Sequence, residues 1–362
     1  MKILFYSRDP GGANIIASIV SLGDFEEYDY DLLGKDMALE KYNEFNLIGQ
    51  DIETCIENLS YENIRRFLIE SNYDVVFTST SANDMIDKYL WDIGKDIGIK
   101  TCCILDQWMN YSVRFTEKGI RNNYKNINNQ DLKYVPDYIF CMDDYSKEKL
   151  IDIGIKSARV KIVGHPYFEY LKHNFSNSFL QEGDDFKVLF ASEPISQNYE
   201  FDDFGYNELT VLKDVVEELR SIANKNKKNI YLTIKLHPRE ILKVYHNEIK
   251  SDKYLKVNVE KEIPSKELIK TCNLVIGMTS MFLFESYMLG TKTLSVQTGL
   301  NKESTFLFDI MGLDFTIRDK VKLNKILENI IIHNLYDDVV YDMDNLTIDS
   351  VKRITKVLEG II

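Results

Sequence analysis

The sequence has no long apolar run and does not begin like a secreted protein. A membrane-spanning helix needs about 18 or more apolar residues in succession, and no stretch of that kind is present. The first residues, MKILFYSRDPGG, turn polar after Tyr6, before the apolar core that a secretory signal requires. We therefore expect a cytoplasmic protein with no transmembrane segment.

The chain also lacks an excess of positive charge. It has 44 Lys and Arg residues against 57 Asp and Glu residues, which gives a formal net charge of −13. Nucleic acids and anionic membranes both require a basic surface, so we expect neither to be the main partner. A local basic pocket is compatible with this balance.

Cysteine is scarce, with five residues that include the adjacent pair Cys102 and Cys103. The spacings CxxC and HExxH, which are typical of metal sites, do not occur. We expect buried free thiols rather than disulfides, and we expect neither a bound metal nor a cofactor.

Apolar segments with strand-like and helix-like patterns alternate along the 362 residues, a length that favours two domains. Such alternation predicts α/β domains with mostly parallel, doubly wound sheets. The expected strands are 2–7, 74–79, 100–105, 137–142, 159–163, 187–191, 230–236, 254–259, 273–277 and 292–296. The expected helices include 61–71, 83–94, 145–153, 208–224, 323–333 and 349–358.

A polar stretch at residues 172–185 is interpreted as a linker. It separates a first Rossmann-like domain, residues 1–171, from a second one, residues 186–346. A C-terminal helix within residues 347–362 is expected to pack back on the first domain. We expect the two Rossmann-like domains to face each other across a cleft.

The most informative stretch is IYLTIKLHPRE, residues 230–240, an apolar strand that runs into a cationic cluster. Ligands of open α/β sheets bind beyond the carboxyl ends of the strands, where Lys235, His237 and Arg239 are expected to lie. An Arg side chain can hold a phosphate through two bonds, and a His side chain can donate one. We therefore predict an anion site here, and the alternative is a purely structural histidine.

A second run, NLVIGMTSMFLFESYMLGTKTLSV, places Thr279 and Ser280 between a strand and an apolar helix. The N–H groups at the start of a helix and these two hydroxyls suit a phosphate, although simple capping of the helix uses the same geometry. Glu285 lies inside the apolar helix and is predicted to accept hydrogen bonds from ribose hydroxyls.

The first strand is followed by RDPGGANIIASIVSL. Gly11 and Gly12 allow the backbone to pass close to a ligand, and Asn14 is expected to cap a helix that begins at Ile15. The pattern is neither GxGxxG nor a lysine-bearing phosphate loop, so a plain tight turn is an equal alternative.

The strand at 100–105 leads into the polar and aromatic segment LDQWMNYSVRFT. Asp106, Trp108 and Arg114 are expected at the carboxyl edge of the sheet and therefore on the ligand side. A hydroxyl nucleophile needs a general base. The candidates are Asp106 and Glu208, with Asp9 ranked behind them.

These motifs resemble the GT-B superfamily of nucleotide-sugar glycosyltransferases. The run VGHPYFEYL, residues 163–171, is similar to the hinge of lipid-A-disaccharide synthases and UDP-N-acetylglucosamine 2-epimerases. The HP pair followed by Thr-Ser is similar to bacterial sialyltransferases, polysialyltransferases and teichoic-acid glycerophosphotransferases. An acidic sialyltransferase motif is not evident, however, and the epimerase glycines before a glutamate are replaced by GMTSMFLFE.

The resemblance implies that His237, Thr279 and Ser280 bind the phosphates of a nucleotide-sugar donor and that the first domain receives the acceptor. We expect a metal-independent glycosyltransferase that uses a UDP- or CMP/CDP-linked sugar in surface polysaccharide or glycoconjugate biosynthesis. The acceptor would be a glycan or a lipid-linked molecule. The alternatives are an enzyme like UDP-N-acetylglucosamine 2-epimerase and a non-catalytic nucleotide-sugar-binding protein. The sequence leaves the oligomeric state open.

Overall fold

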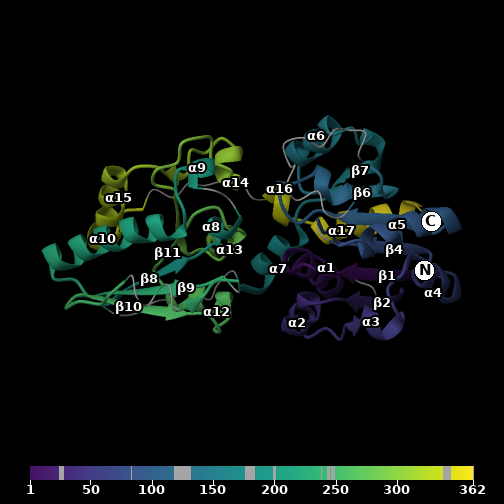
Figure 1. Ribbon diagram of the computed structural model, residues 1–362, viewed down its shortest axis with the longest axis horizontal. Helices are drawn as coiled ribbons and strands as arrows, with labels where there is room; N and C mark the ends of the chain where they lie inside the picture. The colour runs from purple at the N-terminus through teal and green to yellow at the C-terminus, as the bar shows by residue number, and fades with distance from the viewer. Residues whose placement is uncertain are drawn as a thin grey trace. The chain divides into compact units, whose positions relative to one another are not determined.

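The computed structural model describes residues 1–23, 28–82, 84–117, 132–175, 184–198, 201–237, 239–242, 245, 249–336 and 344–361. It divides into two compact units. Unit 1 comprises Met1–His173 and Asp342–Ile362, and unit 2 comprises Asn174–Tyr341. Figure 1 shows that helices and strands alternate through both units.

Unit 1 is built on a seven-stranded sheet in the order β3-β2-β1-β4-β5-β6-β7, and its strand pairs are parallel. The order reverses between β1 and β4, so their carboxyl ends form the switch point at which doubly wound sheets bind ligands. Every residue of β4 is buried, as expected for a parallel strand with both faces covered. The strands are β1 (Lys2–Ser7), β2 (Asp29–Gly34), β3 (Gln50–Asp51), β4 (Val75–Thr78), β5 (Lys100–Ile104), β6 (Tyr138–Cys141) and β7 (Val160–Ile162).

The helices of unit 1 include two from the end of the chain, α16 and α17. The backbone N–H of His165 donates to the carbonyl of Leu346 in α16, at 2.7 Å. The N–H of Val351 in α17 donates to the Glu169 carboxylate, at 3.0 Å. The helices are α1 (Pro10–Leu22), α2 (Met37–Glu44), α3 (Ile52–Cys55), α4 (Tyr61–Ser71), α5 (Ile86–Ile97), η1 (Ser112–Phe115), α6 (Asp144–Asp152), η4 (Ser157–Arg159), α7 (Pro166–Phe175), α16 (Asp344–Thr347) and α17 (Ser350–Ile361).

Unit 2 has a six-stranded sheet in the order β10-β9-β8-β11-β12-β13, again with parallel pairs. Here the order reverses between β8 and β11, which places a second switch point at the carboxyl ends of these two strands. The strands are β8 (Phe186–Ala191), β9 (Ile230–Lys235), β10 (Leu255–Glu260), β11 (Leu274–Gly277), β12 (Lys292–Val296) and β13 (Thr316–Ile317).

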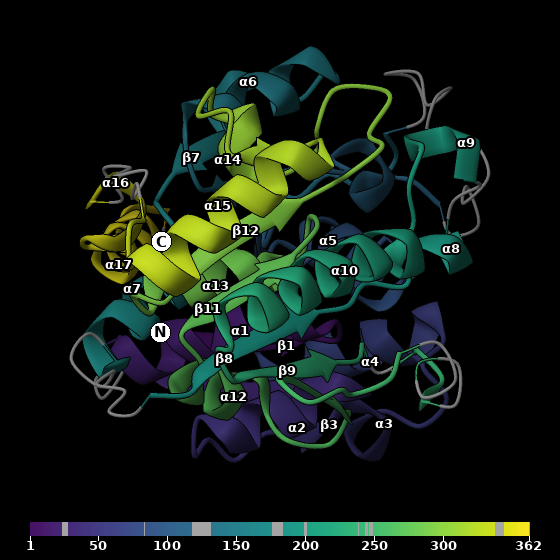
Figure 2. The same ribbon diagram turned by 90° about the vertical axis from the view of Figure 1, so that its left-hand side faces the viewer.

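The long helix α10 covers one face of the unit 2 sheet. Figure 2 shows α10 and α15 side by side over the strands. Residues Leu212, Val215 and Leu219 of α10 are fully buried against the sheet, as their helical spacing predicts. The helices are α8 (Ile195–Asn198), α9 (Phe201–Phe204), α10 (Glu208–Asn226), α12 (Ser265–Thr271), α13 (Met281–Met288), α14 (Leu307–Ile310) and α15 (Lys320–His333).

The α/β fold predicted from the sequence is confirmed, and each predicted strand overlaps an observed one. The prediction missed β2, β3 and β13, because β3 and β13 have only two residues each and the first half of β2 is polar and exposed. The segment between β8 and α10 contains two short helices, α8 and α9. Residues 172–175 of the expected linker belong to α7.

The helix expected from Ile15 begins earlier, at Pro10, so the prediction that Asn14 caps it is wrong. Asp9 is the residue at the cap position, and proline suits the first turn because its fixed φ angle and missing N–H cost nothing there. The expected start of the helix at 83–94 falls on Asn83, which lies outside the described residues, and α5 itself begins at Ile86. No described helix is long and apolar enough to cross a membrane.

Candidate functional site

The predicted site residues form two groups, one at the carboxyl edge of each sheet. In unit 1, the centre of the group is an ion pair between Asp106, which follows β5, and Arg114 in η1. The Nη1 atom of Arg114 lies 2.7 Å from Oδ1 of Asp106, and the two side chains are only 4% and 11% exposed. Arg114 also donates to the hydroxyl of Thr80 in the turn after β4. The predicted proximity of Asp106 and Arg114 is therefore observed.

The two predicted glycines lie in the first turn of α1, which follows β1 and passes close to residues after the neighbouring strands. A Cβ atom on Gly11 would lie 2.4 Å from Oδ2 of Asp106. A Cβ atom on Gly12 would lie 2.4 Å from Cβ of Ser79, which follows β4. Both positions thus require glycine, and the close approach in this structure is to protein groups at the switch point.

Three buried polar atoms of unit 1 have no hydrogen-bond partner among the described residues. They are Oδ1 of Asn14, Nε of Arg114 and Nδ1 of His165. Asn14 lies one helical turn beyond Gly11 in α1, and Nε2 of His165 is 3.4 Å from the carbonyl of Asp106. Because buried polar atoms are nearly always satisfied in folded proteins, such a group is typical of a functional region.

Asp9, the lowest-ranked candidate base, also belongs to this edge. Burial raises the pKa of its carboxyl group, and the charge of Asp106 raises it further, whereas the Ser81 hydroxyl and the guanidinium groups of Arg8 and Arg114 oppose the rise. Asp9 is therefore easier to protonate than an exposed aspartate.

Trp108 contributes to the edge through its ring and through its N–H group. Nε1 donates to the Asp143 carboxylate at 2.6 Å, and the ring lies nearly parallel to His165, with centroids 5.6 Å apart. The ring of His165 also stacks on the ring of Phe168, with centroids 3.7 Å apart. Burial lowers the pKa of His165 to about 4. The sequence placed His165 in a hinge motif, and its contact with Asp106 was missed.

A buried Asp-Lys pair, also missed, holds the turn after β4. Nζ of Lys88 donates to the carbonyls of Ser81 and Asp84, at 3.2 and 3.0 Å. The Asp87 carboxylate accepts from the N–H of Ser81, at 2.8 Å. Burial raises the pKa of Asp87 to about 7 and lowers that of Lys88. The pair keeps Thr80 in place beside Arg114.

In unit 2, His237 follows β9 and is held in one tautomer. Its Nδ1 atom accepts a hydrogen bond from the N–H of Arg239 at 3.2 Å, so a neutral ring carries its proton on Nε2. Burial and the charges of Arg239 and Lys261 lower the pKa of His237 to about 4. The half-buried ring is therefore neutral at pH 7, and its Nε2–H group is a hydrogen-bond donor.

The other residues of the predicted cationic cluster differ in their surroundings. The Lys235 ammonium donates to the carbonyl of Lys261, whereas Arg239 is exposed. Pro238 lies outside the described residues. Glu240 is buried and accepts from the His237 N–H at 2.7 Å and from the Ser192 hydroxyl at 2.8 Å, so it fixes the turn that carries His237.

Thr279 and Ser280 follow β11, and their N–H groups already donate hydrogen bonds to an acidic side chain. The Glu193 carboxylate, in the turn after β8, accepts from the N–H groups of Thr279 and Ser280, both at 2.6 Å, and from the Thr279 hydroxyl at 2.7 Å. The Ser280 hydroxyl also caps α13 by accepting from Phe282 N–H at 3.2 Å. The sequence missed Glu193, which is 86 residues away from Thr279.

The two remaining predicted glutamates occupy different settings. Glu208, the first residue of α10, is 4% exposed and accepts from the N–H and hydroxyl of Ser196, at 2.9 and 2.5 Å. These contacts favour a structural role that fastens the turn after β8 to α10. Glu285 lies in the second turn of α13 and is partly exposed.

No protein-family model matches the sequence, and a search of curated protein sequences finds no match. Solved structures do match over nearly the whole chain. UDP-GlcNAc 2-epimerase from Methanocaldococcus jannaschii, in complex with UDP-GlcNAc and UDP, has a TM-score of 0.62 at 17% identity, covering 99% of this chain and 100% of that one. UDP-GlcNAc 2-epimerase from Neisseria meningitidis bound to UDP-GlcNAc has a TM-score of 0.67 at 13% identity, with the same coverage.

MurG from Acinetobacter baumannii also matches, with a TM-score of 0.52 at 10% identity and coverage of 99% of this chain and 100% of that one. At these identities the likeness shows the fold. The chain has two Rossmann-like α/β units, and the predicted GT-B fold is confirmed.

The low pKa of His165 predicts how the stability of unit 1 depends on pH. An unfolded histidine takes up a proton as the pH falls through about 6.5, whereas folded His165 resists protonation down to about 4. The free energy of unfolding should therefore fall between these two values, by up to about 3 kcal/mol for this group. Substituting His165→Gln should lower stability at pH 7 and reduce this pH dependence.

Urea unfolding at pH 7 and pH 4.5, followed by tryptophan fluorescence, measures the effect. Both tryptophans, Trp91 and Trp108, lie in unit 1, so the signal reports on that unit. The matched control is His333→Gln, at the exposed end of α15 in unit 2. An unchanged pH dependence in His165→Gln would contradict the assignment.

Proposed function

We propose that the protein is a glycosyltransferase that uses a nucleotide-activated sugar, UDP- or CMP/CDP-linked, in the biosynthesis of a surface polysaccharide or glycoconjugate. The observation that carries this proposal is the group of hydrogen-bond donors at the carboxyl edge of the unit 2 sheet, the His237 ring and the N–H groups of Thr279 and Ser280. The names of the similar structures support the donor class, because they describe proteins that bind UDP-GlcNAc or UDP.

The donor phosphates are proposed to bind at the carboxyl edge of the unit 2 sheet. His237 offers a neutral Nε2–H donor, and Arg239 adds an exposed positive charge. The N–H groups of Thr279 and Ser280 already donate hydrogen bonds to the Glu193 side chain, which supports the view that they suit the oxygen atoms of a phosphate. These groups would stabilise the charge that develops on the leaving nucleotide, without a metal ion. Glu285 remains the proposed ligand of the ribose hydroxyls.

Unit 1 is proposed to bind the acceptor, a glycan or a lipid-linked molecule. Asp106 is the proposed general base, because Arg114 fixes one of its carboxylate oxygens and the other faces the glycine turn after β1. Asp9, with its raised pKa, is the second candidate for proton transfer. The contacts of Glu208 make it the weakest of the three.

The proposal predicts that nucleotide affinity depends on His237. In His237→Ala, the loss of one hydrogen bond to a phosphate should weaken the binding of UDP, CMP or CDP by about tenfold or more. Isothermal titration calorimetry measures this, with His333→Ala as the matched control. If the wild type binds none of the three nucleotides, the functional proposal fails; if the variant binds as well as the wild type, the site assignment fails.

A second prediction concerns Glu193, whose carboxylate uses the N–H groups assigned to the phosphate. Both anions cannot occupy the same donors, so Glu193→Ala should bind UDP about tenfold more tightly than the wild type. The control is Glu262→Ala, which removes an exposed carboxylate from the same unit. Unchanged or weaker binding would show that the phosphate does not bind at Thr279 and Ser280.

The second candidate function is a UDP-GlcNAc 2-epimerase-like activity, which is favoured by the names of several similar structures. An epimerase converts UDP-GlcNAc without an acceptor, whereas the proposed transferase should leave it unchanged. Incubation of the protein with UDP-GlcNAc alone, followed by NMR, separates the two. Formation of the 2-epimer, and its loss in Asp106→Asn, would replace the transferase proposal with the epimerase.

A further inference from the structure

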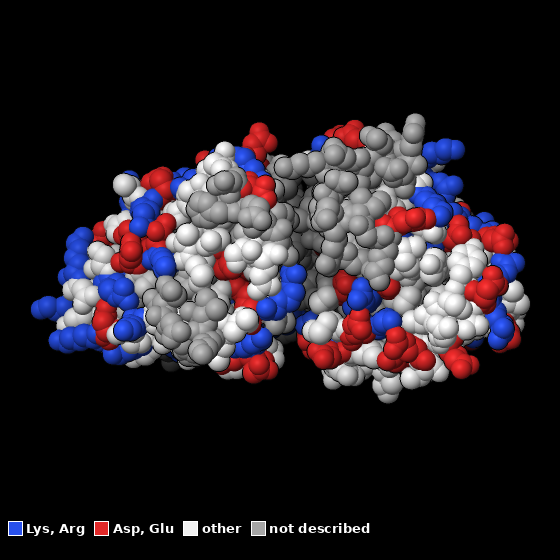
Figure 3. Space-filling view, viewed as in Figure 1, with Lys and Arg blue, Asp and Glu red and all other residues white. Residues whose placement is uncertain are grey.

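Lysine side chains gather at the amino-terminal edge of the unit 2 sheet, opposite the carboxyl edge that carries the candidate phosphate site. Figure 3 shows this accumulation of Lys and Arg at the left-hand end, over the end of α10 and the starts of the strands. We call this surface the basic edge. It consists of Lys187, Lys227, Lys228, Lys250, Lys253 and Lys256.

The strand register sets two of these lysines beside an exposed aromatic ring. Tyr231 of β9 pairs with Lys187 of β8 on one side and with Lys256 of β10 on the other. Residues paired across parallel strands point to the same face, so the three side chains form a row. Tyr231 is 40% exposed, and both lysines are exposed.

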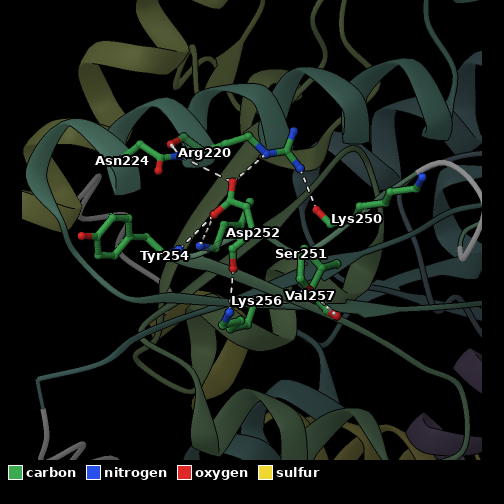
Figure 4. A network of polar contacts seen from close by, with 9 residues as sticks. Arg220, Asn224, Lys250, Ser251, Asp252, Tyr254, Lys256 and Val257 are labelled. Atoms are coloured by element: carbon green, nitrogen blue, oxygen red, sulfur yellow. Dashed lines mark hydrogen bonds and ion pairs between the residues drawn. The ribbon is translucent and has the colours of Figure 1, made fainter.

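The turn that leads into β10 is fixed by hydrogen bonds to Asp252, as Figure 4 shows. Its carboxylate accepts from the N–H groups of Tyr254 and Leu255, at 3.0 and 2.9 Å, and from Nε of Arg220 at 3.0 Å. Arg220 also donates to the carbonyl of Lys250, at 2.8 Å, while the Lys250 side chain points away from the network. The lysines of this turn are thereby held at the surface.

The charges of the basic edge are largely uncompensated. In the part of the chain that the structure describes, none of its six lysines forms an ion pair. The acidic side chains beside it include Asp184 and Asp185, Asp252, which is paired with Arg220, and Glu328, which is paired with Lys225. Because the whole chain has a formal net charge of −13, the surface outside the basic edge is strongly acidic.

We propose that the basic edge docks on the surface of an anionic lipid bilayer. Clustered lysines are attracted to anionic headgroups, and tyrosine is favoured at the depth of the headgroups. A flat membrane can touch this edge alone, whereas a long soluble polyanion would also meet the acidic remainder of the chain and be repelled. Docking through the amino-terminal edge leaves the carboxyl edge of the same sheet uncovered.

This inference refines the expectation from net charge, which disfavoured an anionic membrane. The net charge is a sum over the whole chain. A membrane surface interacts mainly with the protein charges that lie within about one Debye length of it, roughly 8 Å at physiological salt. The inference does not depend on the proposed nucleotide site, since the two lie at opposite edges of the unit 2 sheet.

Sedimentation of the full-length protein with vesicles tests the proposal. The wild type should bind vesicles made of equal parts phosphatidylcholine and phosphatidylglycerol, should not bind phosphatidylcholine alone, and should be released at about 1 M salt, where the Debye length is about 3 Å. The triple variant Lys187→Glu, Lys250→Glu, Lys253→Glu should lose this binding by more than about tenfold.

The matched control reverses three exposed lysines of unit 1, Lys100→Glu, Lys156→Glu and Lys352→Glu, and so changes the net charge equally. It should bind anionic vesicles like the wild type, and circular dichroism confirms that both triple variants are folded. The proposal is overturned if the wild type does not bind the anionic vesicles, or if the control loses binding to the same extent. Retention on heparin without vesicle binding would also overturn it, in favour of a soluble polyanion.

Discussion

Both units depend on one constraint, the parallel direction of their strands. In a parallel sheet all carboxyl ends lie at the same edge, and the turns that follow them are the parts of the chain free to carry polar side chains. The order of strands reverses once in each sheet, between β1 and β4 and between β8 and β11. The turns at these points carry Gly11 and Gly12 in unit 1 and Glu193, Thr279 and Ser280 in unit 2. The candidate site residues are concentrated there because the central strands β1, β4, β8 and β11 are largely buried.

The carboxyl edges of the two sheets satisfy their buried acidic side chains in different ways. In unit 1 a carboxylate is matched by a guanidinium, since Asp106 pairs with Arg114, and a removed partner would leave an uncompensated charge. In unit 2 a carboxylate is matched by backbone N–H groups, since Glu193 is held by Thr279 and Ser280. In the second arrangement, burial raises the pKa of Glu193 although its hydrogen bonds lower it. The backbone donors that Glu193 occupies are the ones to which the donor phosphates are proposed to bind.

Charged side chains are also distributed unevenly over the surface of unit 2. The net charge of −13 describes an acidic protein, yet the starts of β8, β9 and β10 form a surface rich in lysine. The same parallel order that collects the site residues at one edge collects these lysines at the other. The proposed nucleotide site and the proposed membrane contact lie at opposite edges of the unit 2 sheet, so neither proposal depends on the other.

The sequence alone determined the α/β architecture and the positions of most strands, because buried parallel strands are short continuous apolar runs and the helices between them have a regular apolar period. It also located His237, Asp106 and Arg114 at strand ends, since the end of an apolar run is a local feature. It did not determine what these residues touch. Two of these contacts join residues far apart in the chain. Thr279 and Ser280 donate hydrogen bonds to Glu193, and His165 contacts Asp106. Only the tertiary structure decides such contacts, because strand order, and not sequence distance, sets which turns become neighbours.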